Sequence, residues 1–155
     1  MFENFKVIRK RLSLFNPIKR IHKLNFKTRL RYILSWYRCS EIYFLIDNNN
    51  YFAGYMILEK GGGRYKFSNK DDVIISPIYI LLNYRGRNLS QLLMGCIPNN
   101  KKVFSIIGKE NFISVNAHLT SGFKLYSDLK YKRSFKTYHL TKEVTNTKLY
   151  AKIRK

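Results

Sequence analysis

The stretch that decides the fold is residues 75–94, ISPIYILLNYRGRNLSQLLM. Its first half is apolar and rich in isoleucine, which is typical of a strand. From Asn88 onward, Leu, Gln and Met are typical of a helix. The short polar segment Arg85-Gly86-Arg87 lies between the two halves. The stretch therefore predicts a strand that passes through a tight turn into a helix.

That turn has the features of a phosphate-binding site. The first amide groups of a helix have no partner inside the helix, and the helix dipole is positive there. Gly86 would let these amides approach an anion closely, and Arg85 and Arg87 add guanidinium donors. Two other interpretations stay open: an ordinary exposed Arg-Gly-Arg turn, and Asn88 as an ordinary helix N-cap.

Outward from this stretch, the periodicity predicts a mixed order of strands and helices. Pro77 predicts a local irregularity in its own strand. A first strand or a short helix is expected around Phe5, and the polar tail should fray from Thr141. The other expected strands are 41–46, 51–58, 102–107, 123–127 and 135–140, beside 73–82, and the expected helices are one or two within 18–36, then 88–94 and 111–119.

This order predicts an α/β (α+β) protein with helices packed on the faces of a mixed sheet. A length of 155 residues predicts one domain, 1–155. We divide it into a basic helical part (1–40), a core (41–140) and a basic tail (141–155). The cysteines, Cys39 and Cys96, and the three histidines are scattered along the chain. We therefore expect neither a disulfide scaffold nor a metal site.

Charge is the most unusual bulk property, with a net value of +21. Residues 1–40 hold 11 Lys/Arg against 1 Asp/Glu, residues 41–100 hold 6 against 5, and residues 101–155 hold 13 against 3. The two ends are therefore basic and the middle is nearly neutral. Basic surfaces attract polyanions such as nucleotide phosphates, nucleic acid or anionic lipid. A lysine-rich composition without functional meaning explains the same charge.

Two motifs resemble those of the GNAT acetyltransferase superfamily. Its acetyl-CoA-binding motif, R/Q-x-x-G-x-G/A after an apolar strand, is matched by Arg85, with Asn88 where glycine is usual and Ser90 where glycine or alanine is usual. Asn best tolerates the left-handed backbone after glycine. Downstream, Asn111 follows the next strand, and Gly122-Phe123 follow the asparagine by the family's eleven residues. The resemblance spans residues 41–140.

The resemblance implies a mostly antiparallel central sheet whose strands splay apart to form a cofactor cleft. The backbone of Ile78 and Ile80 would contact the pantetheine arm of acetyl-CoA, and Asn111 would lie near that arm. The pyrophosphate would bind the amides of the turn, contributed by Gly86, Arg87, Asn88, Leu89 and Ser90. A strand that is not fully paired also accommodates Pro77.

The resemblance also implies acetyl transfer from acetyl-CoA to an amine, or to a hydroxyl, without a metal. Many members protonate the leaving thiolate with a tyrosine seven residues after the asparagine, where this chain has His118. Histidine can donate a proton near neutral pH, although a buried structural role is the alternative. Tyr79 lies on the strand that lines the cleft and is the second catalytic candidate. Glu59 and Asp72 are weaker candidates for the base.

For the acceptor, Ile75-Ser76-Pro77 and Tyr84-Arg85-Gly86-Arg87 resemble an I-G-P…Y-R-G-K-G branch found in bacterial surface-polysaccharide synthesis. This suggests a small-molecule or glycan-precursor acceptor, such as an amino sugar on a nucleotide or lipid phosphate. We expect a cytoplasmic protein, with its basic ends suited to the anionic inner membrane face.

Two other functions remain open. A basic domain with 12 Tyr and 11 Phe could bind nucleic acid, but no RNA-binding signature is present and nucleic acid is the less favoured partner. An acetyl-CoA-binding domain without catalysis is the other. The sequence does not indicate an oligomeric state.

Overall fold

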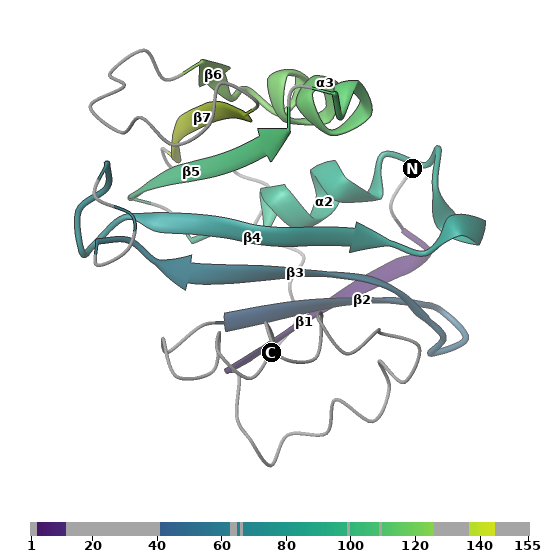
Figure 1. Ribbon diagram of the computed structural model, residues 1–155. Helices are drawn as coiled ribbons and strands as arrows, with labels where there is room; N and C mark the ends of the chain where they lie inside the picture. Colours follow the sequence, from purple (N-terminus) through teal and green to yellow (C-terminus); the bar gives the residue numbers. More distant parts are fainter. Residues whose placement is uncertain are drawn as a thin grey trace, which may run out of the picture.

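The computed structural model describes residues 3–11, 41–62, 65, 67–98, 100–108, 110–125 and 137–144. In these residues a seven-stranded sheet is joined by two α-helices and one 3-10 turn (Figure 1). The elements in chain order are β1 (Phe5–Arg11), β2 (Glu41–Asp47), β3 (Phe52–Lys60), β4 (Val73–Ile80), η2 (Leu82–Tyr84), α2 (Leu89–Gly95), β5 (Lys101–Gly108), α3 (Phe112–Thr120), β6 (Lys124–Leu125) and β7 (Thr137–Val144).

The strands lie in the order β1-β2-β3-β4-β5-β7-β6. Every neighbouring pair is antiparallel except β4 and β5, which are parallel. A parallel pair needs a crossover, and the chain makes it through η2 and α2. The prediction of a mixed, mostly antiparallel sheet is thereby confirmed.

The main core lies between the sheet and α2. Leu89, Leu93 and Met94 of α2 are buried, and they pack with side chains from β2 to β5 and with Phe123. A second cluster forms around Ile42, Tyr55 and Ile57, joined by Phe44 and Phe52. Because β3 contributes to both clusters, it is buried along almost its whole length. Such a continuous apolar run is typical of a central strand covered on two faces.

Strand β4 is irregular where Pro77 predicts it. Met56 of β3 lies opposite Ile78, whereas Leu58 lies opposite Ile75. One residue of β3 therefore faces two residues of β4, Ser76 and Pro77, which is a β-bulge. Pro77 is exposed there. A bulge tolerates proline because the extra residue leaves the regular ladder.

The predictions about the two ends of the chain and the segments near them had different outcomes. The segment around Phe5 is a strand, β1, and not a helix. Fraying from Thr141 is wrong for residues 141–144, because β7 continues to Val144 and pairs with Lys101 at the start of β5. Ladder pairing outweighs the polar composition there. The described part of the predicted strand at 123–127 contains the short strand β6 (Lys124–Leu125). The predicted helices within 18–36, residues 126–127 and the tail after 144 lie outside the described residues.

Candidate functional site

Strands β4 and β5 part halfway along β4. They pair only from Val73 to Ile75, opposite Val103 to Ser105. Beyond this point β4 stays with β3 as far as Ile80, while β5 stays with β7 as far as Gly108. Figure 1 shows β5 rising away from β4 toward the right-hand end of the sheet. In the described part of the chain, the β5-facing edge of β4 therefore has no ladder partner after Ile75.

The register identifies the backbone groups at this edge. The Leu81 N–H donates to the Ala53 carbonyl at 2.9 Å, and hydrogen-bonded pairs alternate along an antiparallel ladder. The backbone groups of Tyr79 therefore face β3, and those of Ile78 and Ile80 face the gap. The Arg85 Nε donates to the Ile80 carbonyl at 3.1 Å. The structure thus brings three predicted site residues, Ile78, Ile80 and Arg85, to one end of the gap.

The turn after β4 has the backbone that an anion site requires. Gly86 has φ 77° and Asn88 has φ 55°. Both values are left-handed, the conformation in which glycine and asparagine are least strained. A Cβ added at Gly86 would meet nothing within 4 Å, so its backbone is open to a ligand.

Asn88 occupies the N-cap position of α2 but makes no side-chain capping hydrogen bond. The interpretation of Asn88 as an ordinary cap therefore does not hold. Among the described residues, no acceptor is recorded for the backbone N–H groups of residues 86–90. Successive free N–H groups in a turn with left-handed residues form a concave anion-binding nest. Leu89 contributes backbone alone, because its side chain is 2% exposed in the core.

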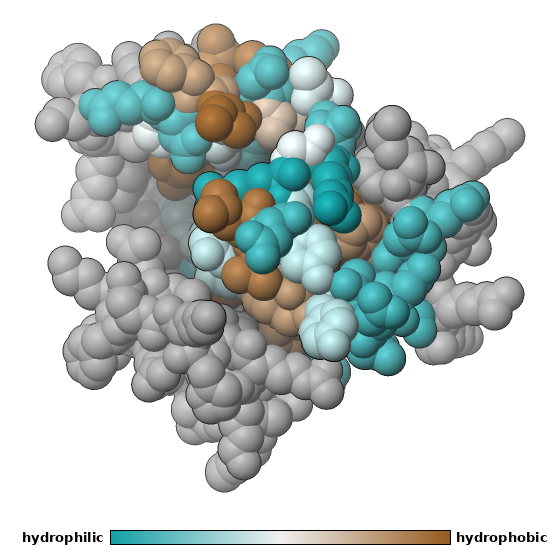
Figure 2. Space-filling model, turned by 90° about the vertical axis from the view of Figure 1, so that its right-hand side faces the viewer, coloured by the Kyte–Doolittle hydropathy of each residue, from teal (hydrophilic) through white to brown (hydrophobic). Residues whose placement is uncertain are grey.

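The two arginines of the turn are held differently. Arg85 folds back over the end of β4 through its bond to Ile80. The guanidinium of Arg87 lies 5.8 Å from the ring centroid of Tyr84, a distance typical of a cation–π contact. Both arginines are exposed. Figure 2 shows this end of the molecule, where hydrophilic and hydrophobic residues interleave.

Sequence reasoning missed the anchor of this turn, Asp47. The Tyr84 hydroxyl donates to Asp47 Oδ2 at 2.8 Å, across 37 positions of sequence. This hydrogen bond, followed by burial, raises the pKa of Tyr84. Burial opposes ionisation of Asp47, but hydrogen bonds from Tyr51, Tyr84 and Asn49 outweigh it and lower the pKa of Asp47. The only sequence signal is the turn composition of residues 47–50, which does not name a distant partner.

Asn111 lies at the N-cap of α3. Its Oδ1 accepts a hydrogen bond from the Ser114 N–H at 3.1 Å, and its residue is exposed. The side-chain oxygen therefore caps the helix. Because this bond fixes the orientation of the side chain, it also fixes the direction of the amide nitrogen. Ser90 is half-buried at the start of α2. Helices α2 and α3 are joined by Gln91 Nε2, which donates to Thr120 Oγ1 at 3.0 Å.

His118 lies on α3, two helical turns after Asn111, and is 3% exposed. Its Nδ1 is 2.8 Å from the Ser114 carbonyl. A carbonyl only accepts, so Nδ1 carries the proton in this arrangement. Nε2 is then unprotonated and carries a lone pair. It is buried and has no hydrogen-bond partner among the described residues. Burial lowers the pKa of His118, and the bond to Ser114 offsets part of this effect. The ring also packs edge-on against Phe123 at 5.0 Å.

Tyr79 lies on the opposite face of β4 from Ile78 and Ile80, which pack against the main core. It is 38% exposed, and its ring lies 5.9 Å from that of Tyr55. Burial, together with the Tyr79 hydroxyl, raises the pKa of Tyr55 to about 12. Tyr79 thus lies beside a residue of the second cluster, whereas the ring of His118 packs against Phe123 of the main core.

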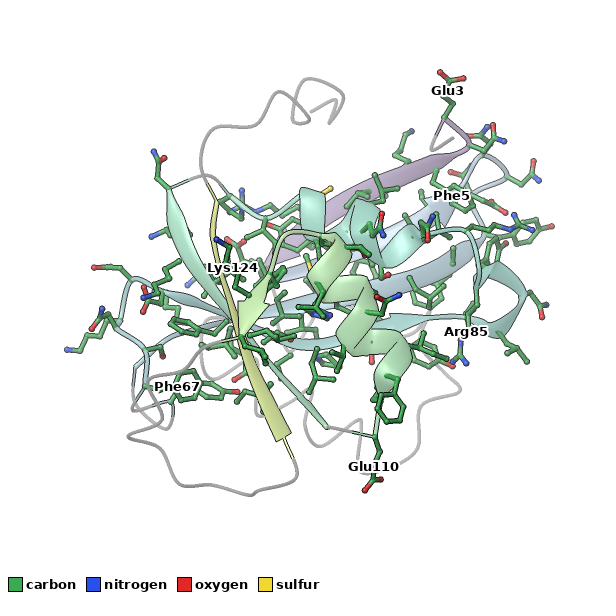
Figure 3. All side chains as sticks on the ribbon, turned by 90° about the horizontal axis from the view of Figure 1, so that it is seen from above. Glu3, Phe5, Phe67, Arg85, Glu110 and Lys124 are labelled. Carbon is green, nitrogen blue, oxygen red and sulfur yellow. The ribbon has the colours of Figure 1, made fainter. Side chains whose placement is uncertain are left out.

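The weaker base candidates have structural partners. Glu59 is 2% exposed and accepts a hydrogen bond from the Tyr65 hydroxyl at 2.9 Å. Asp72 accepts from the Asn69 N–H at 2.6 Å. Tyr65 packs near Phe67, and Figure 3 shows Phe67 at the end of the sheet opposite Arg85. The structure therefore separates Glu59 and Asp72 from the turn of residues 85–88.

The described residues contain no group of three or more His, Cys, Asp or Glu arranged to hold a metal ion. None of the helices in this part of the chain has the length and apolarity that crossing a membrane requires.

No protein-family model and no curated protein matches the chain. Solved structures do match. A protein from Bordetella pertussis assigned to the GNAT acetyltransferase family has a TM-score of 0.61 and 15% identity, over 90% of this chain and 96% of that one. Mutant forms of the spermidine/spermine N-acetyltransferase SpeG from Vibrio cholerae give 0.60 and 13%, over 88% and 94%.

A third match is the Campylobacter jejuni N-acetyltransferase PseH in complex with acetyl coenzyme A. Its TM-score is 0.57 with 12% identity, over 88% of this chain and 98% of PseH. These likenesses show that the chain has the fold of GNAT acetyltransferases, and they confirm the fold prediction.

Proposed function

We propose that this protein transfers an acetyl group from acetyl-CoA to an amine or hydroxyl of a small acceptor. The observation that carries the proposal is the parting of β4 from β5 after Ile75, directly before a turn whose backbone N–H groups have no acceptor among the described residues. A ligand with an extended arm that leads into a diphosphate matches both features. The structure of PseH with acetyl coenzyme A supports this choice, because it has the same fold.

Each part of the cosubstrate has a counterpart in the chain. The pantetheine arm carries two amides and would hydrogen-bond to the gap-facing backbone of Ile78 and Ile80, as an added strand does. The diphosphate would take the N–H groups of residues 86–90, with Arg87 beside them. The exposed, positively charged turn tolerates the charge without burying it.

In the reaction, the acceptor nitrogen or oxygen attacks the thioester carbonyl carbon and loses a proton. The carbon–sulfur bond breaks, and the thiolate of CoA leaves and takes up a proton. His118 and Tyr79 are our candidates for the groups that take the proton from the acceptor and supply a proton to the thiolate. His118 donates from Nδ1 to Ser114, and its Nε2 has no partner among the residues that the structure describes. It must therefore first accept a proton at Nε2 before it can protonate the thiolate. The Tyr79 hydroxyl is a candidate proton donor on the exposed face of β4.

For the acceptor we propose an anionic compound, with an amino sugar on a nucleotide or lipid phosphate as the first choice. The net charge of +21 attracts anions and repels polycations. A polyamine, the substrate class in the name of SpeG, is therefore disfavoured here. The same charge would hold the protein at an anionic membrane surface, inside the cell, where such precursors are made.

The first test is binding. Acetyl-CoA and CoA should raise the melting temperature, because a ligand that binds only the folded state stabilises it. Adenosine at equal concentration is the control without a diphosphate and should give a much smaller shift. No shift with either CoA compound, together with tight binding of single-stranded RNA, would instead support a nucleic-acid module.

The second test is transfer, followed as release of free thiol. The acceptor panel should contain amino sugars, nucleotide-linked amino sugars, spermidine and a lysine peptide. We expect the highest kcat/KM with the nucleotide-linked sugars. Binding of acetyl-CoA without thiol release for any acceptor would favour a domain that binds but does not catalyse. A preference for spermidine would contradict the anionic-acceptor proposal alone.

A further inference from the structure

We propose that Asp47 is a positioning residue for the phosphate-binding turn and acts through the hydroxyl of Tyr84. The inference rests on the proposed function, since it concerns how the same turn is held for a diphosphate. Asp47 ends β2, whereas Tyr84 lies in η2, directly before Arg85. The two residues come from different parts of the chain and meet at one end of the sheet.

Asp47 is itself rigidly held. Its Oδ1 accepts the N–H groups of Tyr51 at 2.8 Å and Asn49 at 3.0 Å. Its own N–H donates to the Tyr51 carbonyl at 2.9 Å, and its carbonyl accepts from the Asn50 N–H. These bonds close the β2–β3 turn around the carboxylate. They leave Oδ2 for the Tyr84 hydroxyl at 2.8 Å, so the oxygen that Tyr84 meets is fixed in space.

The Tyr84 ring is held from a second direction by Phe5. Phe5 lies directly opposite Asp47 in the β1–β2 ladder, and its ring meets that of Tyr84 edge-on at 6.1 Å. Figure 3 shows Phe5 and Arg85 at the same end of the sheet. One pair of neighbouring ladder residues therefore fixes both the hydroxyl and the ring of Tyr84.

Tyr84 in turn supports the cation of the turn, because the Arg87 guanidinium lies over its ring at 5.8 Å. Residues 85–88 are all exposed and receive little packing of their own. Apart from the bond of Arg85 to Ile80, such a turn depends on its two ends for pre-organisation. Its downstream end is fixed by Leu89 in the core, and Tyr84 fixes the upstream end. Pre-organisation raises ligand affinity by reducing the ordering cost of binding.

The experiment compares Tyr84→Phe with Tyr51→Phe by calorimetric titration with CoA. Both variants remove one tyrosine hydroxyl from the same end of the molecule. Tyr51 is 66% exposed and serves Asp47 through its backbone alone. We expect Kd for CoA to rise about three- to tenfold in Tyr84→Phe, the effect of one lost hydrogen bond. In Tyr51→Phe the Kd should stay within about twofold of the wild type.

Two further measurements separate positioning from general weakening. Pantetheine lacks the diphosphate, so its affinity should be equal in wild type and Tyr84→Phe. In the acetyl-transfer assay, KM for acetyl-CoA should rise while kcat stays unchanged, because the turn does not contact the reacting atoms. Asp47→Asn should bind like wild type, since its amide can still meet the hydroxyl and accept from the Tyr51 N–H.

The outcomes are distinct. A wild-type protein that gives no heat with CoA overturns the proposed function and this inference with it. Normal CoA binding by wild type and by Tyr84→Phe overturns the inference alone. An equal loss of pantetheine and CoA affinity in Tyr84→Phe also overturns it, because the effect would then not lie at the diphosphate.

Discussion

Ile75 of β4 lies opposite Ser105 of β5, and this pair is the last in the ladder between the two strands. The next residues of β4, Ser76 and Pro77, form the bulge against β3. The bulge and the end of the ladder therefore coincide. A bulge increases local twist and bends its strand, and here it turns β4 away from β5 at the point where the gap begins.

Asn88 allows a test of the left-handed turn by two opposite substitutions. Its φ of 55° suits glycine and strains residues that carry a Cβ without a compensating local hydrogen bond. Asn88→Ala should lower the free energy of unfolding by about 1 kcal/mol, whereas Asn88→Gly should be neutral within about 0.5 kcal/mol. Urea denaturation measures both values. Equal stability of the alanine and glycine variants would contradict the left-handed conformation.

Arg85 has a donor role that glutamine can reproduce. Its Nε donates to the Ile80 carbonyl at 3.1 Å, and a glutamine amide is also a donor. Arg85→Gln should keep CoA affinity within about threefold, and Arg85→Leu should lose roughly tenfold, because the carbonyl then lacks its partner. Calorimetric titration gives both constants. If the two variants bind equally well, the bond to Ile80 has no part in forming the site.

Asn111 combines a helix cap with a predicted cofactor contact, and two variants separate these roles. Asn111→Ala removes the acceptor for the Ser114 N–H and should cost about 1 kcal/mol of stability. Asn111→Ser keeps a capping oxygen and should be nearly as stable as wild type. If the amide nitrogen contacts the cofactor, the serine variant nevertheless binds CoA more weakly. Unchanged CoA affinity in Asn111→Ser would leave Asn111 with the cap alone.

His118 should make stability depend on pH. Its pKa in the folded protein is lowered from 6.5, chiefly by burial. The stability linked to its neutral form is therefore present above about pH 6.5 and is lost as the pH falls from there toward the folded pKa. The melting temperature should fall more between pH 7.5 and 5.5 in wild type than in His118→Gln, which does not titrate. Parallel curves would show that the ring is not held neutral.

The same variant tests the catalytic role of His118. If the ring moves the reaction's protons, His118→Gln should lower kcat by about 10²-fold at saturating acetyl-CoA, the lower end of general acid–base contributions. The pH dependence of kcat should flatten as well. Near-normal turnover would remove His118 from the mechanism and leave the buried, structural role.

Much of the fold was predictable because its signals are local. The apolar runs of β2 and β3, Pro77 at the bulge and the left-handed Asn88 each depend on neighbouring residues. The continuation of β7 to Val144 was not predictable, because polar residues 141–144 become a strand only through the ladder to β5.

The site divides in the same way. The turn of residues 85–88 follows from a contiguous motif, and among the described residues its backbone N–H groups from residue 86 onward have no acceptor. Asp47 was invisible because its link to Tyr84 spans 37 positions. The burial of His118 was not predictable either, because the sequence of α3 has only a weak amphipathic pattern. The ring is covered by Phe123, which lies beyond the end of the helix.

The short ladder between β4 and β5 also has a mechanical consequence. Within the described residues, three paired positions on each strand join the β1–β4 half of the sheet to the β5–β7 half. In the ligand-free protein the sheet should open first at this ladder, and the backbone amides of the paired residues should exchange their hydrogens early. A ligand bound in the gap would connect the two strands through hydrogen bonds that the described part of the chain does not supply. Cofactor loading would then make unfolding of the two halves more cooperative.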